Sequence, residues 1–420
     1  MATRRTRKQN PASSEEAFPA EEYRKRRDAI RKGLHNSILI LEGNTESERG
    51  ELRSGFFQDP HFLYLSGCHT PGACLILAPE TPKLSFQEIL FLPDHDAART
   101  LWTGPAMDAS DSGAARTLGF AKVARRSQFE GILAKLLDQV QSIVCLPGST
   151  VEQSIKQAYP LREFESANDA LASLRMRKSA AEIARMREAI RITAEGQMRG
   201  WRSLQTSRNE YEVSADVTHE FLRLGAERHA FAPIVASGAN ACVLHYSRNR
   251  AALKEGDLTI LDVGAERAGY AGDLTRTIPV GGRFSRRQQQ LYEAVLEVQK
   301  EVIRNVRPGA YIARQVPGSL HQLASSRFGE MRLGPKKKPL SEYFPHGTSH
   351  HLGMEVHDHC DALAPLAPGM VITVEPGVYI PEEGIGIRIE DDVLVTEEGA
   401  EVLSSSLPKE IPDVEAILKR

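Results

Sequence analysis

Four acidic residues stand in or at the ends of apolar, strand-like segments in the second half of the 420-residue chain. They are Asp262, Asp273, Glu375 and Glu390. The apolar residues around each acid predict a buried strand, and an unpaired carboxylate is costly to bury. The fold must therefore bring positive charge to these acids, either from basic side chains or from metal ions.

The alternation of side chains along these strands predicts which groups meet. Successive residues of a strand point to opposite faces, so Asp273, Thr275 and Thr277 share one face. A turn over residues 266–269 predicts a hairpin, and this hairpin lets Asp262 converge with Asp273.

A second pair of strands repeats this arrangement. Segment 369–375 ends in Glu375, and the strand that follows has isoleucines at positions 385, 387 and 389. Arg388 and Glu390 therefore point together to the face opposite the isoleucines. The sequence thus predicts an arginine beside one of the four acids.

Residues 346–359 hold five of the thirteen histidines of the chain, at positions 346, 350, 351, 357 and 359. A histidine that caps a turn explains any one of them alone. Four carboxylates and one imidazole together would suit two divalent ions about 3.5–4 Å apart, and oxygen-rich ligation favours Mn²⁺ over structural zinc. The alternative, salt-bridged acids at strand ends, explains each acid separately but not all four beside a histidine cluster.

The composition is that of an ordinary globular protein with room for two or three domains. The 53 Lys and Arg residues nearly balance the 55 Asp and Glu residues, so no global charge indicates a nucleic acid or membrane partner. No apolar run is long enough to span a bilayer, and the start of the chain lacks the apolar core of a signal peptide. Five scattered cysteines indicate free thiols rather than disulfides. A cytoplasmic location is expected.

The first part of the chain alternates strands with helices. Residues 1–20 are predicted to be a disordered basic tail, and residues 21–170 an α/β domain. A charged helix follows Glu21, and further helical patterns occur near 96–102 and 127–140. Strands are expected at 37–43, 62–65, 73–78, 89–92 and 142–146. His61, just before one of these strands, is a weak site candidate.

Residues 171–420 are predicted to form the second domain. The Ser-x-x-Glu box at Ser179 opens a long helix, a second helix covers 209–224, and the Ser-x-x-Gln box at Ser285 opens a third. Strands are expected within 231–282, and again at 370–380 and 385–396. The stretch between the third helix and the histidine cluster is expected to be irregular, with an exposed basic loop at Pro335–Pro339.

These motifs, taken in order, closely resemble those of the pita-bread metallopeptidases. The motifs are Leu-Asp262-Val-Gly, Gly-Asp273-Leu-Thr-Arg-Thr, His346-Gly-x-x-His350-x-x-Gly-x-x-x-His357-Asp, Thr-Val-Glu375-Pro-Gly and Arg388-Ile-Glu390-Asp. The chain is most similar to the aminopeptidase P group, with prolidase next. The resemblance implies an α/β (α+β) architecture. In it, an N-terminal creatinase-like α/β domain precedes a pita-bread domain with a curved antiparallel sheet and flanking helices.

The resemblance also implies roles for individual residues. The ligands of the two ions would be Asp262, Asp273, His350, Glu375 and Glu390, with Asp273 and Glu390 bridging both ions. The ions would be Mn²⁺, with Zn²⁺ or Co²⁺ as alternatives. His245, His346 and His357 would surround the substrate, Arg388 would support Glu390, and Glu375 would also carry a proton. His351 and His61 depart from the family pattern.

The implied activity is hydrolysis of the bond before a proline in the second position of a peptide, by attack of a hydroxide shared between the two ions. Prolidase, which cleaves only Xaa-Pro dipeptides, shares every ligand and stays open as an alternative. Creatinase lacks the metal ligands, and a non-catalytic pita-bread module that binds protein partners typically loses them. The family is often oligomeric, so a homodimer or homotetramer is expected.

Overall fold

The computed structural model describes residues 17–46, 55–80 and 86–418. The chain divides into two compact units between Leu174 and Arg175, inside helix α8 (Asn168–Met176), whereas the sequence placed the boundary after residue 170. Most of the predicted tail, residues 1–16, lies outside the described residues. Residues 17–20 do not fit a disordered tail, because Phe18 is buried and helix α1 begins at Ala20.

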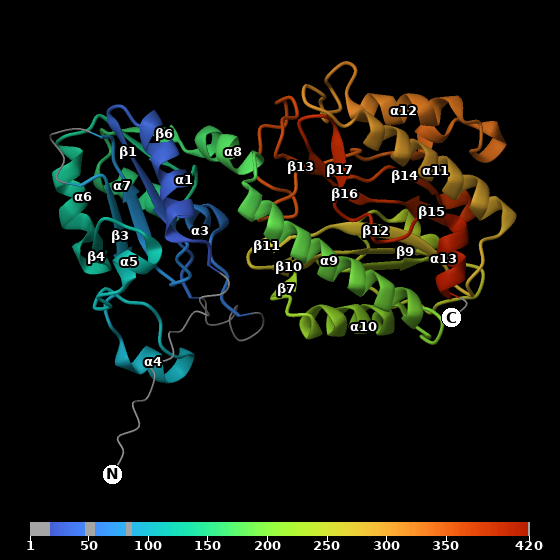
Figure 1. The fold of residues 1–420 in the computed structure, drawn as a ribbon, viewed down its shortest axis with the longest axis horizontal. Coiled ribbons are helices and arrows are strands. Elements are labelled where there is room, and N and C mark those ends of the chain that lie inside the picture. Colours follow the sequence, from blue (N-terminus) through green and yellow to red (C-terminus); the bar gives the residue numbers. More distant parts are fainter. Residues whose placement is uncertain (1–16, 47–54, 81–85, 419–420) are drawn as a thin grey trace, which may run out of the picture. The chain divides into compact units, whose positions relative to one another are not determined.

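The first unit is built on a six-stranded mixed sheet (Figure 1). Its strands are β1 (Ser37–Glu42), β2 (Cys74–Leu77), β3 (Glu88–Leu92), β4 (Val123–Arg125), β5 (Ser142–Cys145) and β6 (Glu163–Ser166). They lie in the order β4-β3-β2-β1-β5-β6. The β1–β2 and β2–β3 pairs are antiparallel, and the β3–β4, β1–β5 and β5–β6 pairs are parallel.

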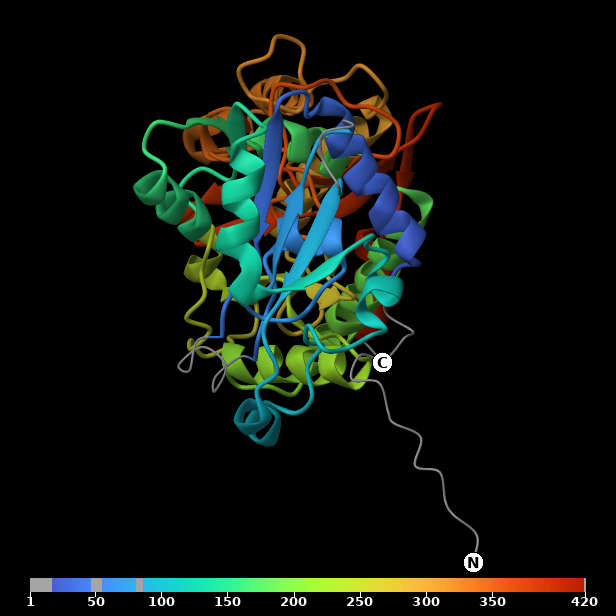
Figure 2. The same cartoon turned by 90° about the vertical axis from the view of Figure 1, so that its left-hand side faces the viewer.

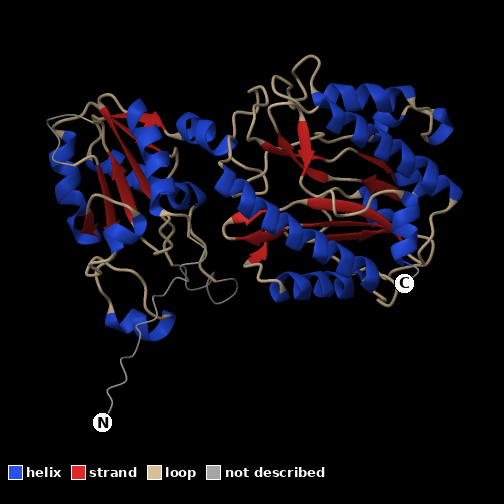
Figure 3. Ribbon diagram, in the orientation of Figure 1, coloured by secondary structure: helices blue, strands red, loops and turns tan. Residues whose placement is uncertain are grey.

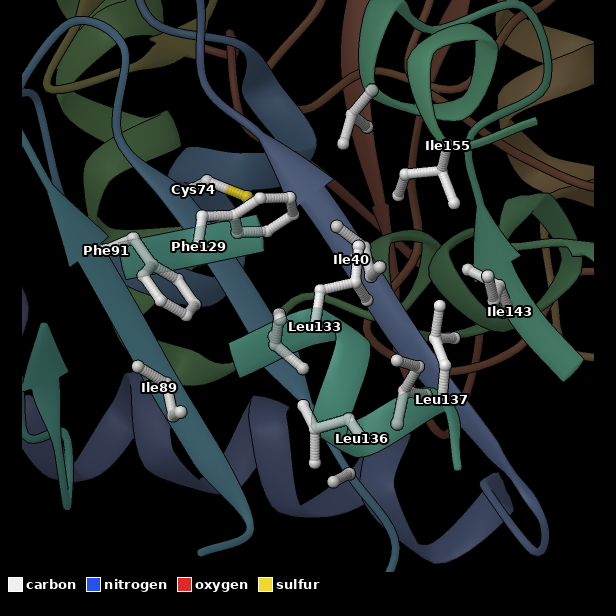
Figure 4. Close-up of a cluster of buried hydrophobic side chains, with 14 of the residues drawn as sticks. Ile40, Cys74, Ile89, Phe91, Phe129, Leu133, Leu136, Leu137, Ile143 and Ile155 are labelled. Carbon is white, nitrogen blue, oxygen red and sulfur yellow. The ribbon is translucent and has the colours of Figure 1, made fainter. Parts of the chain in front are cut away.

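Helices cover both faces of this sheet (Figure 2). The helices of this unit are α1 (Ala20–Gly33), α3 (Pro60–Ser66), α4 (Ala97–Thr103), α5 (Ala114–Leu118), the 3₁₀ turn η1 (Arg126–Gln128), α6 (Phe129–Leu137) and α7 (Thr150–Ala158), of which α4 lies below the sheet in Figure 1. Alternate strand residues such as Ile40 and Phe91 pack against Phe129 and Leu133 of α6 (Figure 4). The Phe91 and Phe129 rings meet edge to face at 5.2 Å. The predicted α/β layering is confirmed.

The strand predicted at residues 62–65 is wrong, because this segment is helix α3. The Asp59 carboxylate accepts a hydrogen bond of 2.8 Å from the backbone N–H of Phe62, and Pro60 occupies the first helical turn. Gly67 ends the helix in the left-handed conformation, with φ of 64°. Asp-Pro and Gly are therefore the start and stop signals of a helix here, not of a turn into a strand.

The helices of the second unit are α9 (Ala180–Ser203), α10 (Glu210–Arg223), α11 (Arg286–Asn305), α12 (Leu320–Glu330) and α13 (Ile411–Leu418). Both predicted capping boxes form, because Ser179 and Ser285 each exchange hydrogen bonds with the residue three positions later. The stretch expected to be irregular contains α12, which Ser319 caps by accepting from Gln322. Within the described parts of the chain, none of the helices is long and apolar enough to cross a bilayer.

The strands of the second unit form small antiparallel sheets between these helices (Figure 3). The first half contains β7 (Arg228–His229), β8 (Ile234–Ser237), β9 (Leu258–Val263), β10 (Ala265–Arg267), β11 (Tyr270–Ala271) and β12 (Leu274–Pro279). The second half contains β13 (Val371–Val374), β14 (Gly377–Ile380), β15 (Ile385–Arg388), β16 (Asp391–Val395) and β17 (Ala400–Val402). The strand orders are β11-β10-β7, β12-β9-β8, β13-β16-β17 and β14-β15. Helix α9 packs on β9 to β12, and α11 packs on β13 to β15.

Each strand predicted in the second half is two strands in two different sheets. Residues 370–380 divide at Glu375–Pro376, and residues 385–396 divide at Ile389–Glu390. β13 pairs with β16, whereas β14 pairs with β15. Pro376 has no N–H to continue a ladder. Both predicted acids therefore stand where one ladder ends and the next begins.

A buried ion pair stabilises the first unit. Arg27 of α1 is fully buried, and its Nε donates to Oε2 of Glu88 on β3 at 2.7 Å. The same guanidinium donates to the carbonyl oxygens of Leu65 and Gly119, at 3.0 and 2.6 Å, and lies 3.8 Å from the centre of the Phe120 ring. One side chain thus joins helices α1 and α3, strand β3 and the C-terminal end of α5.

Replacement of this arginine by a neutral side chain of similar length should destabilise the first unit strongly. Arg27→Met leaves the buried Glu88 carboxylate without its cation, which costs about 3–5 kcal/mol. Urea unfolding followed by circular dichroism measures the loss. Arg24→Met, which breaks an exposed pair with Glu21, is the control and should change stability by less than about 1 kcal/mol. Equal effects of the two substitutions would contradict the prediction.

Candidate metal centre

The first two acids meet at the break between two antiparallel hairpins. In the β9–β12 ladder Asp262 lies opposite Thr275, and Asp273 immediately precedes β12. The ladder breaks at two glycines where the chain segments almost touch. A Cβ atom on Gly264 would lie 2.1 Å from the carbonyl oxygen of Gly272. The predicted hairpin is present, and these glycines allow the close approach that brings the two acids together.

Two threonines of β12 bring Glu390 to these acids. The Glu390 N–H donates to the carbonyl oxygen of Thr275 at 3.1 Å, and the Thr275 hydroxyl donates to Oε2 of Glu390 at 2.6 Å. The Thr277 hydroxyl accepts from the N–H of Arg388 and donates to its carbonyl oxygen, at 3.1 and 3.0 Å. The predicted shared faces of these residues are therefore confirmed.

His350 points its Nε2 atom at two carboxylates. This atom lies 3.4 Å from Oδ2 of Asp273 and 3.5 Å from Oε1 of Glu375. The opposite nitrogen, Nδ1, lies 3.1 Å from the carbonyl oxygen of His351 and donates to it. Nε2 is therefore the nitrogen that faces the acids, the orientation in which a metal-binding histidine is usually held. Burial alone would lower the pKa of His350, but Asp273 and Glu375 outweigh burial and raise the pKa to about 9. Single ligand atoms of Asp273, His350 and Glu390 all lie within 4.8 Å of one another.

The electrostatics of the centre indicate a missing positive charge. Burial, helped by Asp262, raises the pKa of Asp273 to about 7 even though His350 opposes the change. Burial and Asp273 raise the pKa of Glu390 well above its usual value, and burial raises the pKa of Glu375. Oδ1 of Asp262 is also buried, with no hydrogen-bond partner within the described residues. This oxygen-rich set, with its unmet negative charge, fits divalent cations.

A directed chain of hydrogen bonds runs along one side of the centre. Arg388 donates to Oδ2 of Asp262 at 2.6 Å and to the hydroxyl of Tyr379 at 2.7 Å. The Tyr379 hydroxyl lies 2.8 Å from Nε2 of His346, and Nδ1 of His346 lies 2.7 Å from the carbonyl oxygen of Gly347. Because that carbonyl can only accept, Nδ1 carries the proton and Tyr379 donates to Nε2. Burial and Arg388 lower the pKa of His346 to about 3, so this ring is neutral.

Tyr379 is a site residue that the sequence reasoning missed. Its place could have been predicted from the alternation of side chains along an extended chain. Tyr379 lies four residues after Glu375, so the two side chains are expected on the same face. Gly377, between them, makes room for the hydroxyl, since a Cβ there would lie 2.7 Å from it.

The remaining predicted site histidines lie at the more exposed edge of the centre. The rings of His357 and His350 are perpendicular, with centroids 4.4 Å apart. Burial lowers the pKa of His357, and the charges of His350 and then His245 lower it further, so His245 lies close to His357. Both His245 and His357 have exposed side chains. They are the two histidines best placed to touch a bound molecule.

Two other histidines considered from the sequence, His351 and His61, differ from the site histidines in their surroundings. The His351 side chain is buried, neither ring nitrogen has a hydrogen-bond partner among the residues described, and burial lowers its pKa to about 4. It is therefore a neutral packing residue whose carbonyl oxygen orients His350. His61 lies in the first turn of α3 in the first unit, and its candidate role stays a prediction.

Known families account for both units of the chain. Residues 184–397 match the model of metallopeptidase family M24, and residues 23–145 match that of the aminopeptidase P N-terminal domain. The Xaa-Pro aminopeptidase of Haemophilus influenzae is 34% identical, over 96% of this chain and 98% of the relative. The chain belongs to metallopeptidase family M24.

Further relatives of this M24 chain agree with the assignment. The Arabidopsis thaliana protein named intermediate cleaving peptidase 55, mitochondrial, is 34% identical over 95% of this chain and 83% of the relative. The structure of Escherichia coli aminopeptidase P with the inhibitor Pro-Leu has a TM-score of 0.84 and 30% identity, over 96% of this chain and 99% of that one. The expected family and the expected two-part α/β architecture are confirmed.

The M24 chain anchors the His357 loop through a buried carboxylate. Oδ1 of Asp358 lies 2.6 Å from the guanidinium of Arg175, and Oδ2 lies 3.0 Å from Nζ of Lys178. Burial alone would raise the pKa of Asp358, but Lys178 and Arg175 outweigh burial and lower the pKa to about 2. The residue after His357 is thereby fixed to the segment before α9.

We expect Asp358→Asn to destabilise the protein at neutral pH by about 3–5 kcal/mol, because it leaves buried Lys178 without its carboxylate and leaves Arg175 only its pair with the more exposed Glu355. The folded pKa of Asp358 lies below its ordinary value of 3.8, so its contribution is complete above about pH 4 and is lost as the pH falls toward 2. The stability difference between wild type and variant should therefore narrow below about pH 4.

Urea unfolding of both proteins at steps from pH 7 to pH 3 measures this difference. Asp361→Asn is the control, because Asp361 is exposed and its carboxylate accepts only from the nearby backbone N–H of Leu363 among the bonds described. A stability difference that stays constant over this range would contradict the role assigned to Asp358.

Proposed function

We propose that this M24 chain is a dinuclear-metal aminopeptidase that hydrolyses the bond before proline in the second position of peptides. The observation that carries the proposal is the convergence of His350 with buried carboxylates that lack positive charge. Near full-length similarity to proteins named Xaa-Pro aminopeptidases supports the substrate class.

The residues that would hold the two ions are Asp262, Asp273, His350, Glu375 and Glu390, with Asp273 and Glu390 shared between the ions. When bound, two such ions would lower the pKa of a water between them and stabilise negative charge on a carbonyl oxygen. The donor set, four carboxylates and one imidazole, favours Mn²⁺. Zn²⁺ or Co²⁺ would also fit, and one solved structure is titled zinc-substituted Escherichia coli aminopeptidase P.

Glu375 carries the proton of the reaction. Its Oε1 accepts from the hydroxyl of Thr373 at 3.4 Å, and burial raises the pKa of its carboxyl group. A carboxylate with a raised pKa can take a proton from water and pass it to the leaving nitrogen of proline. That nitrogen lacks a hydrogen in the substrate, so a site that offers it no acceptor leaves no substrate donor unpaired.

The exposed histidines position the substrate and stabilise the developing charge. His245 and His357 lie at the open edge of the centre, where their N–H groups can donate to the carbonyl oxygen as it becomes negative. Burial and Arg388 keep His346 neutral, and the hydrogen bonds from Tyr379 and to Gly347 orient its ring, so it shapes the site without adding charge. Arg388 neutralises part of the charge of Asp262 and supports Glu390 through Thr275.

Three alternative functions are weaker. A prolidase would use the same five ligands, but the similar full-length proteins are named Xaa-Pro aminopeptidases, which favours the aminopeptidase. A creatinase-like enzyme or a non-catalytic binding module would not need the complete ligand set that this chain retains.

The oligomeric state and the cellular location of the protein are further proposals. We expect a homodimer or homotetramer, and the exposed Leu101 and Trp102 of α4 support a protein interface, with 85% and 86% of their side chains accessible. No partner among nucleic acids or membranes is expected. The cytoplasmic location stays a prediction, and one relative is named as mitochondrial.

A panel of proline peptides tests the proposed function. With Mn²⁺, purified protein should release the first residue of Xaa-Pro-Xaa peptides and longer Xaa-Pro peptides, and should leave Xaa-Ala-Xaa peptides intact. A chelator should abolish the activity, and added Mn²⁺ should restore it. Cleavage of Xaa-Pro dipeptides alone would assign a prolidase instead. No cleavage of any proline peptide would contradict both assignments.

Two substitutions should separate metal ligands from substrate-binding residues. Asp273→Asn removes a shared carboxylate, so we expect loss of bound metal together with activity. His357→Ala should lower kcat by about a hundredfold or more while both ions stay bound, because only a donor to the charged intermediate is lost. Metal analysis of the dialysed proteins gives the answer. Loss of metal from the His357 variant would make that histidine a ligand.

A further inference from the structure

Glu210, the first residue of α10, is a buried carboxylate outside the metal centre. No part of it is exposed, and its two oxygens accept four hydrogen bonds. Oε1 accepts from the N–H of Ser237 at 2.9 Å and from the amide of Asn240 at 3.1 Å. Oε2 accepts from the hydroxyl of Tyr246 and from the N–H of Ala251, both at 2.8 Å. Every donor belongs to the segment 237–251.

That segment carries His245 and has little regular structure of its own. After β8 it contains only the short 3₁₀ helix η2 (Gly238–Cys242). Leu244 and Tyr246, on either side of His245, pack against a buried apolar cluster that includes Tyr379 of the centre. His245 itself is exposed. Its place is therefore set by its two neighbours, and the hydroxyl of one of them is bonded to Glu210.

The far end of the segment is fixed beside the same residue. The backbone N–H of Glu210 donates to the carbonyl oxygen of Ala251 at 3.0 Å. Glu210 therefore binds both the backbone N–H and the backbone carbonyl group of Ala251. Asn249 adopts φ of 49°, a left-handed conformation that asparagine tolerates. Its side chain accepts from the N–H of Val235 and donates to the carbonyl oxygen of Pro233, at 3.0 and 2.8 Å.

We propose that Glu210 is the positioning residue for His245. A carboxylate only accepts hydrogen bonds, so it can satisfy four converging donors at once. A glutamine keeps the shape but offers one acceptor oxygen, and its NH₂ group would face two of the donors. The segment would then have to shift, and a displacement of about 1 Å can cost about a hundredfold in rate. This inference rests on the proposed aminopeptidase function of His245.

A double-mutant cycle tests the coupling between the two residues. The proteins are wild type, Glu210→Gln, His245→Ala and the double variant, assayed with Mn²⁺ on an Xaa-Pro-Xaa peptide. Glu210→Gln should lower kcat by about ten- to a hundredfold. In the His245→Ala background the same substitution should cost less than about twofold, because the group that Glu210 places is already gone.

The matched control is Glu212→Gln in the same turn of α10. Glu212 accepts from the N–H of Arg208 and the side chain of Asn209, and no described bond joins it to the His245 segment. This variant should keep wild-type activity. Because buried donors then face an amide, Glu210→Gln should lower the midpoint of thermal unfolding. Circular dichroism at the assay temperature and metal analysis should show a folded variant with wild-type metal content, so that its loss of kcat reflects position and not unfolding.

Hydrogen exchange provides a readout that does not depend on turnover. In Glu210→Gln the peptides that cover 237–251 should exchange faster, in both the wild-type and the His245→Ala backgrounds. Unchanged exchange, unchanged kcat, or an equal loss of kcat in both backgrounds would each overturn the inference. If wild type cleaves no proline peptide, the proposed function fails, while the exchange data still report whether Glu210 orders the segment.

Discussion

The hydrogen bonds between β12 and residues 388–390 are the constraint on which the centre depends. The two halves of the second unit have separate ladders, and Thr275 and Thr277 join them side by side. Because the Thr275 hydroxyl has one proton, donation to Glu390 leaves its oxygen free to accept from Nε of Arg388. One hydroxyl therefore fixes a carboxylate and a guanidinium at once. A valine of the same shape would remove the hydrogen bond at Oε2 of Glu390 and the one at Nε of Arg388.

A residue on the opposite face of β12 also holds the backbone near Glu390 in place. Arg276 alternates with the two threonines and is fully buried. It donates to the carbonyl oxygen of Glu390 at 2.5 Å and to Oδ1 of Asp391 at 2.7 Å, and it also reaches the carbonyl oxygens of Leu407 and Pro408. The backbone of Glu390 is thus held by β12 through residues on both faces. β12 therefore fixes where Glu390 points.

Local sequence patterns predicted much of this, and the exceptions have physical causes. The capping boxes, the face shared by Asp273 and Thr275, and the ligand motifs depend on neighbours in sequence, so they were predictable. Helix α3 was missed because residues such as Asp59-Pro60 and Gly67 occur at the ends of helices and in turns alike. The divisions at Glu375 and Glu390 were missed because a strand changes its partner through tertiary contacts. Tyr379 was missed because its role exists only beside Arg388.

Buried carboxylates in this protein fall into two groups, and the difference between them argues for the function. Glu210 and Asp358 have full sets of protein partners, four neutral donors for one and two cations for the other. The acids of the centre do not. Arg388 reaches only one oxygen of Asp262, and burial with mutual repulsion raises the pKa of Asp273 and Glu390. Asp392, buried beside Asp273 with one oxygen that lacks a partner among the described residues, shares this deficit. Glu210 and Asp358 show that the fold can satisfy a buried acid, so the acids left short of positive charge fit an added cation.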